Sequence, residues 1–237
     1  MHMIDLRLDP ERLVRHAEVE GHNRPDDEDL GYATHGWLQA ALGGLAPWNF
    51  RLLSKRTGEL RLLGYGPARA DELREHAVSF APPLAAQVTD WRHAASKPMD
   101  DVSLKPGQRL GFEVRICPVV RGRAGEQDAF LAEAAHLPHE ELSRARVYGD
   151  WLEKRLSGVA ELDREQCALQ GFRLVSMWRR GHTPNGQATT GRRIVRPDAL
   201  VAGTFTVRDN EGLRQVLARG VGRHRAFGFG MVLLKPA

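Results

Sequence analysis

Near its carboxyl end the chain reads Gly220-Val221-Gly222-Arg223-His224-Arg225-Ala226-Phe227-Gly228-Phe229-Gly230, followed by Met231-Val232-Leu233-Leu234-Lys235-Pro236-Ala237. Glycine stands at four of the first eleven positions. Glycine adopts positive φ angles without strain and lets backbone N–H groups approach a partner closely. Arg223 and Arg225 add positive charge that suits phosphate. The stretch therefore predicts a loop that binds an anionic partner.

The elements on either side of this glycine-rich loop indicate which kind of fold it belongs to. A helix is expected over 210–218 and a strand over 229–234, so the loop follows a helix and opens a strand. Nucleotide-binding loops of the Rossmann and Walker types instead follow a strand and open a helix. This order argues against a nucleotide, and we expect no cofactor. The alternative for the loop is a purely structural turn.

Working outward, each half of the chain shows the same order of elements. The first half predicts a strand over 3–8, a helix over 30–42, a hairpin of strands 50–54 and 60–65, and a helix over 68–78. The second half predicts helical segments within 129–156, strands over 172–179, 192–195 and 201–207, and the final helix and strand. A strand within 107–120 fits the end of the first pattern or the start of the second, and the sequence does not decide between them.

The simplest fold class for this order is α+β, with two tandem ferredoxin-like β-α-β-β-α-β domains. We place the first domain at 1–106 and the second at 107–237. The composition agrees with a globular protein, because the 237 residues are 42% hydrophobic and 27% charged. Cys117 and Cys167 are too few for a disulfide framework, and we expect both to be buried thiols.

The sequence predicts neither a membrane span nor a secretory signal. No apolar run reaches about eighteen residues, and the opening Met1-His2-Met3-Ile4-Asp5 lacks the basic, apolar and small-residue regions of a signal peptide. We therefore expect a cytoplasmic protein that has no membrane partner.

The charge is unevenly distributed along the chain. The net charge of +4 and the pI of about 9.4 are mildly basic. Acidic residues crowd 26–29, where we expect them to favour the start of a helix. Arginine is concentrated between Gly171 and Gly230. The carboxyl-terminal half therefore carries a basic face, which is typical of nucleic-acid binding.

Three motifs together resemble the repeat-processing endoribonucleases of CRISPR systems, and among them the CasE subfamily of the type I-E Cascade complex. They are the terminal glycine-rich loop, the run Leu104-Lys105-Pro106-Gly107-Gln108-Arg109-Leu110 leading to Pro118, and Tyr32-Ala33-Thr34-His35. The resemblance spans nearly the whole chain. Its most specific element is the glycine-rich loop in its helix-loop-strand setting.

The resemblance implies tandem RRM-like domains that bind the hairpin of a CRISPR repeat transcript and cut it at the stem base without metal. It places Tyr32 and His35 at the family's tyrosine and catalytic histidine. It also implies other Cascade subunits as partners. The RNA-binding residues that it implies lie in an arginine-rich hairpin and in the glycine-rich loop: Arg179, Arg180, Arg192, Arg193, Gly220, Gly222, Arg223, His224, Arg225, Gly228 and Gly230.

The chemistry of RNA cleavage without metal suits a histidine. The 2′-hydroxyl attacks the adjacent phosphorus, and an imidazole with a pKa near neutrality can take or give the required proton. Tyr32 lies three residues before His35, on the same helix face. Some relatives carry a lysine shortly after the histidine, which this chain lacks, so we consider Lys55, Arg51 and Arg223 as sources of a cation.

Other interpretations stay open at this stage. Tyr32 and His35 are structural residues if the protein is a noncatalytic RNA-binding subunit. A module that binds a small anion in the glycine-rich loop is a third possibility. His224 either helps catalysis or contacts phosphate, or it is an ordinary surface histidine. His136 and His139 have a spacing that zinc could use, but Pro138 lies between them, and we expect no metal site.

Overall fold

The computed structural model describes residues 1–22, 29–54, 58–100, 102–122, 125–136, 142–179 and 192–237. The chain forms two compact units. The first unit comprises Met1–Asp101, Val175–Arg196 and Ala226–Gly228, and the second comprises Val102–Leu174, Pro197–Arg225 and Phe229–Ala237. The predicted domain division after Pro106 stays a prediction, because compactness does not show which part folds by itself.

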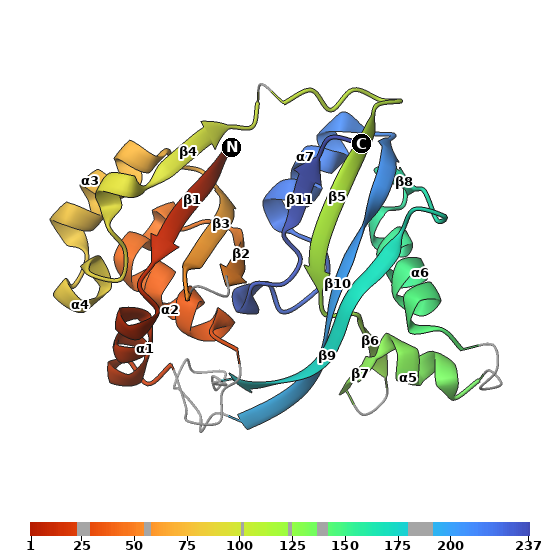
Figure 1. The fold of residues 1–237 in the computed structure, drawn as a ribbon, viewed down its shortest axis with the longest axis horizontal. Coiled ribbons are helices and arrows are strands. Elements are labelled where there is room, and N and C mark those ends of the chain that lie inside the picture. Colours follow the sequence, from red (N-terminus) through yellow and green to blue (C-terminus); the bar gives the residue numbers. More distant parts are fainter. Residues whose placement is uncertain (23–28, 55–57, 101, 123–124, 137–141, 180–191) are drawn as a thin grey trace. The chain divides into compact units, whose positions relative to one another are not determined.

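The first unit is built on a four-stranded antiparallel sheet (Figure 1). The strand order is β2-β3-β1-β4, which is the order of a ferredoxin-like fold. Its strands are β1 (His2–Leu8), β2 (Asn49–Ser54), β3 (Leu60–Gly66) and β4 (Ala95–Pro98). The predicted hairpin of β2 and β3 is confirmed. β4 is fully exposed, so it lacks the alternation of apolar and polar residues that would have predicted it.

Among its described residues, the first unit contains the helices α1 (Pro10–Val19), α2 (Gly31–Leu42), α3 (Ala70–Phe80) and α4 (Pro83–Ala86). The short turns η1 (Gly43–Leu45) and η2 (Trp91–His93) join them. The sequence did not predict α1, because Asp9-Pro10 was interpreted only as the end of a strand. The Asp9 carboxylate accepts hydrogen bonds from the N–H groups of Glu11 and Arg12, so this pair also opens a helix.

The core of the first unit lies between α2 and the sheet. Trp37, Leu38 and Leu42 of α2 are buried in one cluster with Ile4 and Leu6 of β1. One side of α2 is therefore buried in the same core as β1. This packing determines which residues lie on the other side of the helix.

The second unit repeats the order of the first. Its strands are β5 (Arg109–Ile116), β8 (Ala160–Leu162), β11 (Val232–Lys235), and most of β9 (Ala168–Arg179) and β10 (Arg192–Val207). The sheet has the order β11-β5-β10-β8, and β9 pairs with β10. β5 pairs with β10 and β11, so the strand that the sequence left unassigned opens the second pattern. The predicted α+β class with tandem ferredoxin-like units is confirmed.

β9 and β10 are the longest strands and run side by side (Figure 1). Two strands were predicted where β10 is continuous. Pro197 lies in β10 before the point at which β5 begins to pair with it, at Ala199. Proline lacks an N–H group and is tolerated where a neighbouring strand is missing, so it does not end β10.

The second unit has two main helices and one insertion. The helices are α6 (Arg144–Leu156) and α7 (Asn210–Arg219), and α7 was predicted. The insertion follows β5 and consists of the hairpin β6 (Val119–Gly122) and β7 (Gly125–Asp128) and the short helix α5 (Ala129–Ala134). In the described part of the chain, no helix is long and apolar enough to cross a membrane.

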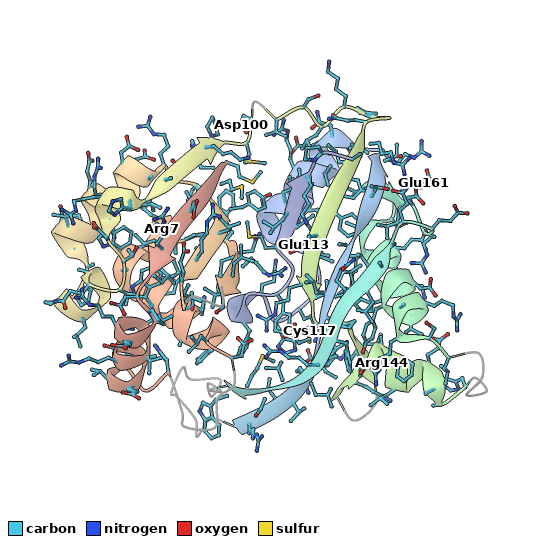
Figure 2. The ribbon with its side chains drawn as sticks, viewed as in Figure 1. Arg7, Asp100, Glu113, Cys117, Arg144 and Glu161 are labelled. Atoms are coloured by element: carbon cyan, nitrogen blue, oxygen red, sulfur yellow. The ribbon has the colours of Figure 1, made fainter. Side chains whose placement is uncertain are left out.

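The two cysteines differ in burial. Cys117 follows β5 directly and is buried, as predicted (Figure 2). Cys167 lies just before β9 and is only half-buried, so the prediction of two buried thiols is wrong for this residue. Partial burial still raises the pKa of the Cys167 thiol.

Candidate active site

The amino end of α2 carries the predicted catalytic pair. Asp29 is buried, and its Oδ1 atom accepts a hydrogen bond of 2.6 Å from the N–H of Gly31. A carboxylate in this place satisfies a free N–H group of the first turn and favours the positive end of the helix. The capping expected of the acidic run is therefore confirmed for Asp29, whereas 26–28 lie outside the described residues.

Tyr32 lies between two other rings. The ring of Phe227, from the glycine-rich loop, stacks on it with centroids 5.2 Å apart and planes inclined by 23°. The ring of His22 meets it edge-on, with centroids 5.7 Å apart and an angle of 78°. Offset stacking and edge-to-face contacts are the favoured arrangements of aromatic pairs. Tyr32 is thus held from two directions.

Two glycines of α2 allow these contacts. A Cβ atom on Gly31 would lie 2.2 Å from the carbonyl oxygen of Phe227. A Cβ atom on Gly36 would lie 2.2 Å from Nδ1 of His22. Real Cβ atoms do not approach other atoms so closely, so a larger residue at either position would displace a neighbour. The backbone at Phe227 and the ring of His22 therefore rest directly on α2.

His35 lies on the same face of α2 as the Phe227 contact. It is four residues after Gly31 and three after Tyr32, and residues at these spacings are neighbours on a helix surface. His35 is half-buried, and this burial lowers the pKa of its imidazole below 6.5. His35 is therefore mainly neutral at pH 7 and can accept a proton.

Glu126 of β7 contacts the middle of the glycine-rich loop. The Glu126 carboxylate accepts a bond of 2.7 Å from Nη1 of Arg223 and lies 2.7 Å from Nε2 of His224. The His224 side chain is only 4% exposed. Its backbone has a φ of +60°, which is uncommon for a residue other than glycine. His224 is thus buried against Glu126, and the surface histidine considered as one alternative is wrong.

Two loop glycines have close neighbours. Gly222 has a φ of +80°, and a Cβ atom there would lie 2.5 Å from the Trp151 ring of α6. Gly230 has a φ of +87°, and a Cβ atom there would lie 2.3 Å from the carbonyl oxygen of Val221. The N–H of Val221 also donates to Gly230, which ties the ends of the loop together. Glycine is therefore required at both positions by fold geometry.

A family profile described as CRISPR associated protein matches residues 1–236. This chain is a CRISPR-associated protein. The resemblance that its motifs show is therefore confirmed at the level of the family. No sequence among the curated proteins matches the chain.

Several solved structures share the fold of this CRISPR-associated protein. The CRISPR endoribonuclease Cse3 bound to a 19-nucleotide RNA is 23% identical, with all of both chains covered and a TM-score of 0.65. Cse3 of Thermus thermophilus, bound to an RNA representing a pre-cleavage complex, is 20% identical over 99% of this chain and 98% of that chain, with a TM-score of 0.57. A chain of a CRISPR RNA-guided surveillance complex is 15% identical over all of both chains, with a TM-score of 0.52.

The predicted arginines of this CRISPR-associated protein lie in different settings. Arg223 pairs with Glu126, and Arg225 is exposed while its Nη1 donates to the carbonyl oxygen of Arg219. Nε of Arg193 donates to the Ser176 hydroxyl. The remaining hairpin arginines cannot be placed as side chains: Arg179 and Arg192 are described only as strand backbone, and Arg180 lies outside the described residues.

The three cations considered for the active site belong to different parts of the chain. Arg51 is buried in β2, Arg223 pairs with Glu126 in the second unit, and Lys55 lies outside the described residues. A catalytic role for any of these three residues remains a prediction. His136 lies two residues after the end of α5, and its possible zinc partner His139 lies outside the described residues.

The sequence did not predict three residues that make long-range contacts with the α2 site or with the glycine-rich loop. Phe227 lies among glycines and charged residues in the sequence, and an aromatic residue inside a glycine-rich loop is a signal of a packing anchor. His22 and Glu126 carry no local motif. Their importance depends on contacts with distant parts of the chain, which composition and spacing do not reveal.

Proposed function

We propose that this protein is a CasE-type endoribonuclease, which cuts the hairpin RNA of a CRISPR repeat at the base of its stem without metal. The observation that carries the proposal is the grouping of Tyr32, a half-buried His35 and the tip of the glycine-rich loop on one face of α2. Membership of the family and the shared fold with RNA-bound endoribonucleases support it.

The chemistry follows from a neutral imidazole beside a phenol. His35 accepts the proton of the 2′-hydroxyl as that oxygen forms a bond to the adjacent phosphorus. The bond from phosphorus to the 5′ oxygen breaks, and that oxygen takes up a proton. The products are a 2′,3′-cyclic phosphate and a 5′-hydroxyl. Tyr32 orients the 2′-hydroxyl or the phosphate through its phenol group.

The loop and the long hairpin account for RNA binding. The stem of an RNA hairpin is A-form, and its deep major groove directs proteins toward phosphate, shape and 2′-hydroxyl contacts. Arg223 and Arg225 supply one group of contacts through their side chains, and the loop glycines and His224 add to it through backbone N–H groups, because the His224 ring is buried against Glu126. The hairpin arginines Arg179, Arg180, Arg192 and Arg193 supply a second group along the stem. Phosphate contacts of this kind set affinity and position.

The partners follow from the same comparison. One of the structures that share this fold is a chain of a CRISPR RNA-guided surveillance complex. We propose that this protein likewise remains bound to the RNA that it has cut and joins other Cascade subunits.

A noncatalytic RNA-binding subunit is the second candidate function. It is favoured by the packing of Tyr32 between Phe227 and His22, since a tyrosine held between two rings can be purely structural. The two functions differ in one outcome, because only the endoribonuclease cuts bound RNA.

The test compares wild type, His35→Ala and His93→Ala on a CRISPR repeat hairpin in excess EDTA. His93 is an exposed histidine of the same unit and serves as the matched control. We expect single-site cleavage by wild type and by His93→Ala, and binding without cleavage by His35→Ala. Tight binding without cleavage by all three proteins would support the noncatalytic subunit. Cleavage by His35→Ala at the wild-type rate would remove His35 from the mechanism.

A further inference from the structure

Phe227 is buried, with 4% of its surface exposed, and its ring stacks on Tyr32. It carries no group that could move a proton or bind a phosphate. Any influence on cleavage must therefore act through packing, and the ring that it packs against belongs to a proposed catalytic residue.

The position of Phe227 is itself fixed by backbone contacts on both sides. Its carbonyl oxygen rests on Gly31, whose N–H is bound by Asp29. The next residue, Gly228, has a φ of +77°, and a Cβ atom there would lie 3.1 Å from the Phe50 ring of β2. Phe227 is therefore anchored both to the first turn of α2 and to the sheet of the same unit.

Tyr32 needs such a support. A tyrosine on a helix can occupy more than one rotamer, and a misplacement of about 1 Å in a reacting group can cost roughly a hundredfold in rate. The stacked Phe227 ring restrains the plane of the phenol, and the edge of His22 restrains it from another direction. The hydroxyl of Tyr32 is thereby directed before RNA binds.

We propose that Phe227 is a positioning residue, which holds the Tyr32 ring in the orientation that cleavage requires. This inference rests on the proposed endoribonuclease function. A residue that only stabilises the glycine-rich loop would affect RNA affinity and protein stability whether or not Tyr32 has a hydroxyl group. A positioning residue affects the cleavage rate only when that hydroxyl is present.

The test is a double-mutant cycle of Phe227→Leu and Tyr32→Phe, measured as single-turnover cleavage at saturating RNA. We expect Phe227→Leu to slow cleavage on the order of tenfold in the wild-type background. In the Tyr32→Phe background, the same substitution should slow cleavage by less than about twofold. Phe227→Tyr, which retains the stacking ring, should restore most of the wild-type rate.

Phe229→Leu is the matched control within the same loop. Phe229 is fully buried, and the Cζ atom of the Arg115 guanidinium lies 4.1 Å from the centroid of its ring. Whatever the size of its effect, we expect it to be equal in both Tyr32 backgrounds. An equal effect of Phe227→Leu in both backgrounds would overturn the proposal, as would a loss explained wholly by weaker RNA binding.

A readout without RNA separates this inference from the proposed function. The chain contains three tyrosines, so isotope-labelled tyrosine gives ring signals for Tyr32, Tyr65 and Tyr148 alone. Phe227→Leu should shift the Tyr32 ring signal, assigned by its loss in Tyr32→Phe, and leave the other two in place. An unmoved Tyr32 signal overturns the positioning inference even if wild type cleaves RNA. If the Tyr32 signal shifts but the wild-type protein does not cleave RNA, the proposed function is wrong. The positioning role of Phe227 in cleavage is then wrong as well.

Discussion

Glu126 and His224 are joined by a contact of 2.7 Å between Oε2 and Nε2, although they are 98 residues apart in the sequence. Glu126 belongs to the hairpin inserted after β5, and His224 lies at the centre of the glycine-rich loop. The same carboxylate binds Arg223. One partly buried acidic residue thus contacts the loop at His224, whose φ is positive, and also pairs with one of its two central arginines.

Loss of Glu126 should destabilise the protein. In Glu126→Ala the buried ring of His224 loses its charged partner, so we expect the free energy of unfolding to fall by about 1–3 kcal/mol. Urea unfolding measures this change. Glu161→Ala is the matched control, because Glu161 pairs with Arg208 on the surface, and exposed pairs contribute about 0–1 kcal/mol. Equal losses in the two variants would show that the Glu126 contact does not hold the loop.

The pH dependence of cleavage should reflect a lowered His35 pKa. Burial lowers this pKa below the usual 6.5, and the neutral imidazole is the proton acceptor. The value of kcat/KM for RNA should therefore rise with pH through a midpoint below 6.5 and then level off. Steady-state rates across this range check the prediction. A rate that falls as pH rises through the midpoint would indicate that the protonated imidazole is the form required.

His16 should make stability depend on pH. It is 2% exposed, neither of its ring nitrogens has a hydrogen-bond partner among the described residues, and burial lowers its pKa while Glu20 partly opposes the shift. The unfolded chain then binds a proton more readily than the folded one. The contribution of the neutral His16 to the free energy of unfolding is therefore fully present above pH 6.5, the ordinary pKa of histidine. It is lost as the pH falls through the lowered pKa of His16 in the folded protein.

This prediction is measured by urea unfolding of wild type and His16→Leu as a function of pH. The difference in stability between the two proteins should change below about pH 6.5 and stay constant above it. His93→Leu serves as the control at an exposed histidine. A constant difference between wild type and His16→Leu at all pH values would contradict the role given to His16.

The hairpin arginines should govern the salt dependence of RNA binding. Each phosphate contact adds roughly 0.7–0.9 to the slope of log affinity against log salt. We expect the double variant Arg179→Ala with Arg180→Ala to weaken binding and to flatten this slope by about 1.4–1.8. Titrations at several salt concentrations measure it. Arg92→Ala, at an exposed arginine of the first unit, should leave the slope unchanged. An unchanged slope in the double variant would exclude these arginines as phosphate contacts.

The fold was largely predictable because its main elements carry local patterns. Alternation predicted β1, and helical spacing predicted α2. The elements that were missed lack such a signal: β4 is exposed along its whole length, and α1 begins at the same Asp9-Pro10 pair that ends β1. One pair of residues can serve as both a strand end and a helix cap, and only tertiary structure shows that it does.

The candidate site was predictable only in part. Tyr32 and His35 were found through a family motif, and the glycine-rich loop through its composition. The contacts of Phe227 with Tyr32 and of Glu126 with His224 join segments from opposite parts of the sequence. Such contacts arise from the packing of each unit, and a single sequence does not show which distant residues will meet.

The chemical nature of the RNA ends tests the central claim most directly. Wild-type protein is incubated in EDTA with a CRISPR repeat hairpin, and with the same RNA carrying one 2′-deoxy nucleotide at the stem base. Mass spectrometry then identifies the products. The account predicts a 2′,3′-cyclic phosphate and a 5′-hydroxyl from the unmodified RNA, and no cleavage of the deoxy RNA. A 3′-hydroxyl with a 5′-phosphate, or cleavage of the deoxy RNA at the same site, would contradict it.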